Sequence, residues 1–115
     1  MRKYFIKTPW ILKRIFSPFT WSFKGTHNEV YLTFDDGPHA TITPWVLDEL
    51  KKHGAKATFF CIGKNVAQHP VIYQRILSEG HAVGNHTQNH LNGWKVPADR
   101  YLADVKEASV HIDSN

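Results

Sequence analysis

Cysteine and long apolar runs are scarce in this chain of 115 residues. The single cysteine, Cys61, has no partner for an internal disulfide, and we expect it to be a small core residue because it lies in the apolar run 57–62. No apolar stretch exceeds four residues, whereas a bilayer span needs about 20 and the apolar region of a signal peptide about 7–15. The sequence therefore predicts neither a transmembrane helix nor a cleavable leader, and a location in the cytoplasm or at the periphery of a membrane.

Acidic side chains are absent from the first 25 residues. These residues hold six Lys and Arg and seven of the fifteen aromatic residues, whereas the rest of the chain holds eight basic and ten acidic residues. Basic and aromatic residues together are typical of a segment on an anionic membrane surface; the alternative is an arm that covers one end of the domain. Since no basic stripe continues into the body, the charge does not indicate nucleic-acid binding. We expect a basic aromatic arm over residues 1–28, with residues 1–25 as the candidate for peripheral membrane contact.

From residue 29 onward, segments typical of strands alternate with segments typical of helices. Aromatic and β-branched residues predict strands over 29–34 and 57–62, and a short third strand over 81–84. The second run is almost continuously apolar, which is typical of a strand that is covered on both faces. Strands that are each followed by a helix pair in parallel through right-handed crossovers. The predicted fold class is therefore α/β.

Proline and glycine mark where the helices begin and end. We expect Thr43 to be an N-cap with proline after it, and Pro70 and Pro97 to open the next two helices. Gly54 and Gly80 stand just past apolar helical stripes, where a left-handed residue typically ends a helix. These signals place helices after all three predicted strands.

Two polar motifs follow the first and the third predicted strands. The first, TFDDGP, contains Asp35 and Asp36, and the second, HTQNH, contains His86 and His90. The carboxyl ends of parallel strands lie at one edge of a sheet, so both motifs point to one site. Adjacent carboxylates repel unless a cation or a shared proton relieves them, and histidines four residues apart lie on one face of a helical turn and can bind one ion. The pattern predicts a metal site.

One carboxylate and two imidazoles leave a coordination position open, which is typical of a catalytic metal ion and makes zinc the expected ion. Such an ion lowers the pKa of a water molecule and polarises a carbonyl group. The position that holds the glutamate base in a metalloprotease helix is Thr87 here. The second carboxylate of the Asp35–Asp36 pair is therefore the candidate base, and the residues themselves leave open which aspartate has which role.

The segments TFDDGP at 33–38 and HTQNH at 86–90 resemble the first two motifs of the polysaccharide deacetylase domain, also called the NodB-homology domain or carbohydrate esterase family 4. The resemblance covers residues 29–115 and includes the order, approximate separation and strand context of the motifs. It implies a metal-dependent hydrolase, usually with zinc, that removes acetyl groups from N-acetylglucosamine units of peptidoglycan, chitin or related glycans. The expected architecture is a partial distorted (β/α) barrel with three parallel strands and flanking helices.

The resemblance also implies a role for each matching residue. Asp35 corresponds to the catalytic base, and Asp36 to the metal-binding carboxylate. His86 and His90 correspond to the two metal-binding histidines. Thr87 matches a Ser/Thr position whose hydroxyl we expect to order the loop that aims the histidines.

Two later motifs of the family do not occur in this sequence, an Arg-Pro-Pro-Tyr-like segment and a Leu-x-His segment whose histidine is the general acid. We therefore interpret the chain as the N-terminal part of a longer enzyme that turns over poorly alone. The alternative is a non-catalytic fragment that binds metal and carbohydrate.

Two other families fit the sequence poorly. A receiver-type signalling domain needs a phosphoacceptor aspartate at the end of a later strand, and the sequence has none there. A haloacid-dehalogenase-like phosphatase needs an Asp-x-Asp pattern, whereas Asp35 and Asp36 are adjacent. Nothing in the sequence indicates an oligomeric state.

Other polar and aromatic residues near the motifs carry weaker expectations. We expect Asn85 and Asn89 to hold the second loop by side-chain hydrogen bonds. His39 is expected in a solvated loop or at the mouth of a pocket, and His81 at the surface or at a helix end. Trp94 is expected either to stack on a sugar or to close the core.

Overall fold

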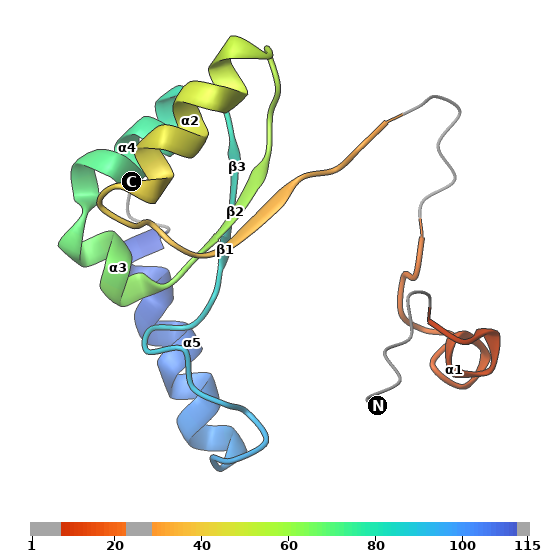
Figure 1. Ribbon diagram of the computed structural model, residues 1–115. Helices are drawn as coiled ribbons and strands as arrows, with labels where there is room; N and C mark the ends of the chain where they lie inside the picture. The colour runs from red at the N-terminus through yellow and green to blue at the C-terminus, as the bar shows by residue number, and fades with distance from the viewer. Residues whose placement is uncertain (1–7, 23–28, 113–115) are drawn as a thin grey trace, which may run out of the picture. The chain divides into compact units, whose positions relative to one another are not determined.

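The computed structural model describes residues 8–22 and 29–112 (Figure 1). The chain divides into two compact units, Met1–Val30 and Tyr31–Asn115. In the first unit, α1 (Trp10–Ile15) buries none of its residues and carries Lys13 and Arg14 in its last turn. Residues 1–7 and 23–28 of the predicted arm lie outside the described residues. Among the residues that are described, no helix is long and apolar enough to cross a membrane.

The second unit contains one parallel sheet with the strand order β1–β2–β3, which confirms the predicted α/β class. The strands are β1 (Thr33–Gly37), β2 (Thr58–Cys61) and β3 (Ala82–Asn85). The first strand begins four residues later than the predicted 29–34, because the ladder starts where Thr33 pairs with Thr58. β1 has a strand on one side only within the described residues, so its outer edge is free.

Four helices follow the strands, one more than the three predicted, because residues 63–68 form a short helix of their own. They are α2 (Ile42–Lys52), α3 (Gly63–Gln68), α4 (Pro70–Ser78) and α5 (Ala98–Ile112). Gly54 and Gly80 have φ values of 59° and 74°, which confirms them as left-handed residues after helices. In Figure 1 the helices α2, α3 and α4 lie on the same side of the sheet, and α5 packs against α3 and β3.

The core lies between this sheet face and the helices. Phe34 of β1 stacks on Phe59 of β2, with ring centroids 5.2 Å apart, and Tyr73 and Ile76 of α4 are fully buried. Cys61 is also fully buried, which confirms its predicted place in the core. Burial raises the pKa of its thiol to about 12. The thiol is therefore protonated and unreactive at neutral pH.

The opposite face of the sheet is open, so the expectation that the second strand is covered on both faces is wrong for the described residues. Phe59 and Cys61 point into the core, whereas Phe60 is 36% exposed. In the ladder Phe60 lies between Asp35 and Gly84. Its ring occupies the space over Gly84, where a Cβ atom would lie 2.6 Å from Phe60 Cδ1. This open face carries Asp35.

The N-terminus of α2 differs from the prediction. Thr43 is inside the helix rather than at its N-cap, and its Oγ1 accepts a hydrogen bond of 2.8 Å from the backbone N–H of His39. The Nδ1 atom of His39 accepts bonds from the backbone N–H groups of Thr41 and Ile42, at 3.2 and 3.4 Å. His39 is exposed and caps the helix, because its ring satisfies amides that have no partner inside the helix.

His81 is buried just past the end of α4, so it lies at a helix end, one of its two predicted places, and not at the surface. Its side chain accepts a hydrogen bond at Nδ1 from the backbone N–H of Ala57, at 3.3 Å, and packs edge-on against Phe59. Burial lowers the pKa of the imidazole, and the nearby charge of Lys56 lowers it further, while Glu79 opposes both. The folded chain therefore keeps His81 neutral at a pH where the unfolded chain protonates it.

We expect the free energy of unfolding to fall as the pH drops below the unperturbed histidine pKa of 6.5, and to level off below the folded pKa of His81. The unfolded chain binds a proton at His81 in this window, and the folded chain does not. Urea unfolding at about pH 7.5 and about pH 5.0 measures this loss. His81→Asn keeps an acceptor for Ala57 and should lose less stability over the same interval. Equal losses in both proteins would contradict the assignment.

Candidate metal centre

Three side chains meet beyond the carboxyl ends of β1 and β3. Asp36 Oδ1 lies 3.2 Å from His86 Nε2 and 3.3 Å from His90 Nε2. The two imidazole rings are 5.0 Å apart between centroids, and the three candidate ligand atoms lie within 4.8 Å of one another. The structure thus brings together residues from two motifs that are fifty positions apart in the sequence.

The donor set and its spacing fit a zinc ion. Two ligand atoms that each lie about 2.1 Å from one ion in a tetrahedral shell are about 3.4 Å apart, close to the distances from Asp36 to the two histidines. Asp36 and His90 are exposed by 62% and 60% of their side-chain surface and His86 by 32%, so solvent reaches the cluster. One carboxylate and two imidazoles can therefore hold a divalent ion and leave room for a substrate group.

A backbone irregularity separates the two adjacent aspartates. Asp35 continues the strand and pairs with Phe60, but the register shifts between Asp35 and Gly37, and Asp36 has a φ of 68°. Asn65 of α3 donates a hydrogen bond of 2.8 Å from Nδ2 to the backbone carbonyl of Asp36 and supports this turn. Asp36 therefore reaches the histidines, whereas Asp35 stays on the open sheet face.

The second motif lies in a loop, as expected, and its two histidines come together without the helical turn that their spacing suggested. Thr87 and His90 have φ values of 66° and 54°, and a helix would need negative values at both. Within the described residues, every non-glycine residue with a positive φ belongs to this site, namely Asp36, Thr87 and His90. Each such conformation costs about 1–2 kcal/mol, so other contacts must hold the loop in this shape.

Asn85 and Asn89 provide side-chain hydrogen bonds to this loop, as predicted. Asn85 accepts the backbone N–H of Thr87 at 2.8 Å and donates to the carbonyl of Val105 at 2.9 Å, which ties the end of β3 to α5. Asn89 donates from Nδ2 to Asp104 Oδ1 at 2.7 Å. The Thr87 hydroxyl is buried and has no hydrogen-bond partner of good geometry among the described residues, so its predicted ordering of the loop stays a prediction.

Asp104 is the site residue that sequence reasoning missed. It is only 6% exposed, and its carboxylate accepts hydrogen bonds from the backbone N–H groups of Gln88 and Asn89. Burial by itself would raise the pKa of Asp104, but the hydrogen bonds from Asn89 and Gln88 outweigh burial and hold the pKa below its usual value. The available signal was its spacing: Asp104 lies four and eight residues before Ala108 and Ile112, on the buried row of α5.

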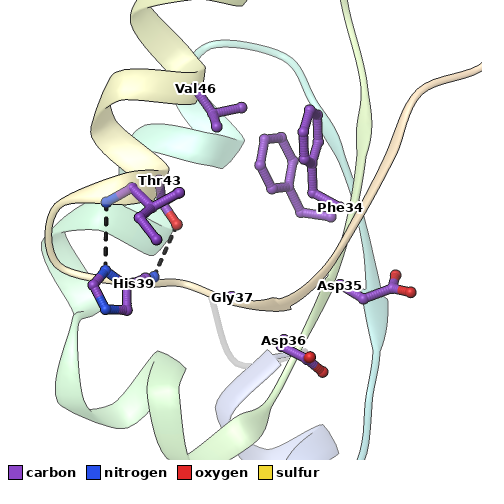
Figure 2. Close-up of a pocket in the computed structure, with 9 residues that line it drawn as sticks. Phe34, Asp35, Asp36, Gly37, His39, Thr43 and Val46 are labelled. Carbon is purple, nitrogen blue, oxygen red and sulfur yellow. Dashed lines mark hydrogen bonds between the residues drawn. The ribbon is translucent and has the colours of Figure 1, made fainter.

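A small cavity of about 220 Å³ lies on the other side of β1, between the strand and α2. Phe34, Thr43 and Val46 contribute to its lining. Asp35 and Asp36 border it, but Figure 2 shows both carboxylates pointing away from the side where Thr43 and Val46 lie. The two carboxylates are therefore available to a ligand at the solvent-facing ends of the strands, and not to a ligand inside this cavity.

Comparison with known proteins gives consistent matches. The sequence profile of the family described as polysaccharide deacetylase matches residues 24–115. A peptidoglycan-N-acetylglucosamine deacetylase of Bacillus cereus is 49% identical over 97 residues, which cover 77% of this chain and 35% of that protein. A chitooligosaccharide deacetylase of Azorhizobium caulinodans is 48% identical over 65 residues, which cover 56% of this chain and 31% of that protein.

Solved structures give the same result. The Bc1960 peptidoglycan N-acetylglucosamine deacetylase superposes with a TM-score of 0.72 at 47% identity, over 74% of this chain and 40% of that chain. The peptidoglycan deacetylase PdaC of Bacillus subtilis superposes with a TM-score of 0.70 at 37% identity, over 72% of this chain and 41% of that chain. The chain thus spans about a third to two fifths of the length of these relatives.

Proposed function

This chain belongs to the polysaccharide deacetylase family, and from that membership we propose that it supplies the metal centre and the base of a hydrolase that removes N-acetyl groups from N-acetylglucosamine-containing polysaccharide. The observation that carries the proposal is the convergence of Asp36, His86 and His90, next to the second carboxylate of Asp35. Relatives whose names specify peptidoglycan and chitooligosaccharide support this class of glycan.

In this proposal Asp36, His86 and His90 hold a divalent ion, with zinc as the ion we expect. When bound, the ion supplies a lower pKa for a water molecule and polarisation of the acetyl carbonyl. Asp35 accepts a proton from the attacking water at one of its carboxylate oxygens. Its position on the open sheet face, beside the cluster and separate from it, suits a base that is not itself a ligand.

The reaction ends when the amide C–N bond breaks and the nitrogen leaves as a protonated amine. In the family, the proton comes from the histidine of the Leu-x-His segment, and this sequence contains no such segment. We therefore propose that the present chain binds the ion and turns over slowly. Contact of residues 1–25 with a membrane remains a separate prediction, as does its alternative, an arm over one end of the domain.

Zinc content and acetate release test the proposal together. We expect about one zinc ion per purified chain and slow release of acetate from N-acetylchitooligosaccharides or peptidoglycan, which a chelator stops. His86→Ala should lose both zinc and acetate release. Asp35→Asn should keep zinc and lose acetate release, because it removes the base and no ligand.

Each other outcome has a defined meaning. Absence of zinc from the wild-type chain would overturn the metal centre. Stoichiometric zinc without any acetate release would overturn the deacetylase assignment for this chain and favour the non-catalytic metal- and carbohydrate-binding alternative. Turnover as fast as that of the full-length relatives would overturn the interpretation that the chain lacks a catalytic part.

A further inference from the structure

The loop that carries His86 and His90 is held by a buried acid on a different element. We infer that Asp104 of α5 is a positioning residue, whose carboxylate fixes residues 86–90 in the conformation that brings both histidines to Asp36. The inference rests on the proposed metal centre and goes beyond it, because Asp104 lies outside the cluster of candidate ligands.

Both carboxylate oxygens of Asp104 are used by the loop. Oδ2 accepts the backbone N–H of Gln88 at 2.8 Å and that of Asn89 at 3.0 Å. Oδ1 accepts the side-chain amide of Asn89 at 2.7 Å. Charge-assisted bonds of this length are among the stronger hydrogen bonds in proteins. They fix the two residues between the positive-φ positions Thr87 and His90.

The carbonyl groups of the same loop are held from the opposite direction. The backbone N–H of Gly63, at the start of α3, donates to the carbonyl of Thr87 at 2.9 Å, and that of Lys64 donates to the carbonyl of Gln88 at 3.2 Å. The peptide units between the histidines are therefore held on both sides, by the start of α3 and by Asp104. Removal of the Asp104 charge weakens one of these sides. It leaves the bonds from α3, the bond from the Gln88 N–H to the Asp104 backbone carbonyl at 3.2 Å, and the bond from the Thr87 N–H to Asn85 in place.

Packing of α5 does not by itself explain an acid at this position. Asp104 lies on the buried row with Ala108 and Ile112, where an apolar side chain would avoid the cost of burying a charge. A buried carboxylate is tolerated when hydrogen bonds satisfy it, and three of the donors to this one come from Gln88 and Asn89. The carboxylate of Asp104 therefore contributes to the structure of the loop rather than to the packing of α5.

The test uses Asp104→Asn, which keeps the size of the side chain and removes its charge. We expect zinc affinity to fall about 10- to 100-fold, as is typical when a group that orients metal ligands is lost. Without metal, amide hydrogen exchange at Gln88 and Asn89 should become faster, while amides in β2 stay as protected as in the wild type. Glu107→Gln, an exposed change on the same helix, should alter neither readout.

The two readouts separate this inference from the proposed function. If the wild-type chain binds no zinc, the metal centre fails, and amide exchange alone then decides the role of Asp104. Unchanged zinc affinity and unchanged exchange in Asp104→Asn would overturn the inference. If Asp104→Asn does not fold, Asn89→Ala replaces it, because that variant removes only the 2.7 Å bond and should give a smaller change in the same direction.

Discussion

Replacement of Asp36 by asparagine is expected to weaken zinc binding by more than about a hundredfold, since the loss of a direct ligand should exceed the loss of a supporting group. Asp36 Oδ1 is the atom shared by both histidine contacts, at 3.2 and 3.3 Å. The neutral amide keeps the shape of the side chain but removes the negative charge that offsets the charge of the ion. Isothermal titration with zinc, or competition with a chromophoric chelator, measures the change.

The adjacent residue offers a matched control. Asp35→Asn makes the same chemical change one position away, but Asp35 faces the open sheet and lies outside the cluster. Its zinc affinity should stay within about threefold of the wild type, because a nearby charge contributes far less than a ligand. Equal weakening in both variants would show that the two carboxylates share the ion and would contradict the separate roles proposed for them.

Gly63→Ala is expected to lower the free energy of unfolding by about 1–3 kcal/mol, the usual cost of overpacking a close contact. A Cβ atom on Gly63 would lie 2.1 Å from Gln88 Oε1 and 2.8 Å from the Cα of Ala108. The Gln88 side chain can turn aside, but the backbone of α5 cannot, so α3 and α5 must move apart. Urea unfolding followed by circular dichroism measures the loss.

Two comparisons make the Gly63 prediction specific. Lys64→Ala changes an exposed residue in the same turn of α3 and should alter stability by less than about 0.5 kcal/mol. Gly63→Ala should cost less in an Ala108→Gly background, because that change removes the Ala108 Cβ, which lies 3.0 Å from the new methyl group. Additive effects of the two substitutions would contradict a contribution from the Ala108 Cβ and leave the 2.8 Å contact with the Ala108 Cα as the cause.

The Gly63→Ala substitution should also weaken zinc binding at the metal centre. Gly63 donates its backbone N–H to the carbonyl of Thr87, which lies between the histidines in the sequence. A displaced α3 would pull on this bond, so zinc affinity should fall together with stability in Gly63→Ala. In Lys64→Ala both should remain, because the backbone N–H of Lys64 is unchanged.

The elements that could be predicted from the sequence are those with local causes. Gly54 and Gly80 end their helices because only a left-handed residue fits there, and Pro70 begins α4 as its first residue. The apolar runs place β2 and β3 within one residue of their observed bounds. Such signals depend on a few neighbouring residues, so they can be read from the sequence without knowledge of the fold.

The shape of the site could not be predicted because its causes lie far away in the sequence. The spacing of His86 and His90 suggested a helical turn, but the shape of the loop follows from hydrogen bonds that it donates to Asp104 and accepts from the start of α3. Asp36 turns out of its strand with support from Asn65, twenty-nine residues later. Both effects exist only after the helices have packed.

The buried face of α5 shows the same limit. Leu102 is 57% exposed, whereas Asp104 is buried together with Ala108 and Ile112. Hydrophobicity alone assigns an aspartate to the surface. Its burial depends on the donors that the loop presents to it.

The outer edge of β1 has no partner strand among residues 8–22 and 29–112, and this gives the two acids of β1 a second role. An unpaired strand edge is a template for intermolecular β-sheet and aggregation, and proteins commonly protect such edges with charged side chains. Two copies of β1 that paired antiparallel about Asp35 would place like charges directly opposite each other, which is unfavourable. Variants that neutralise Asp35 or Asp36 should therefore be handled as dilute samples, since they lose a charge that opposes self-association as well as a carboxylate of the proposed site.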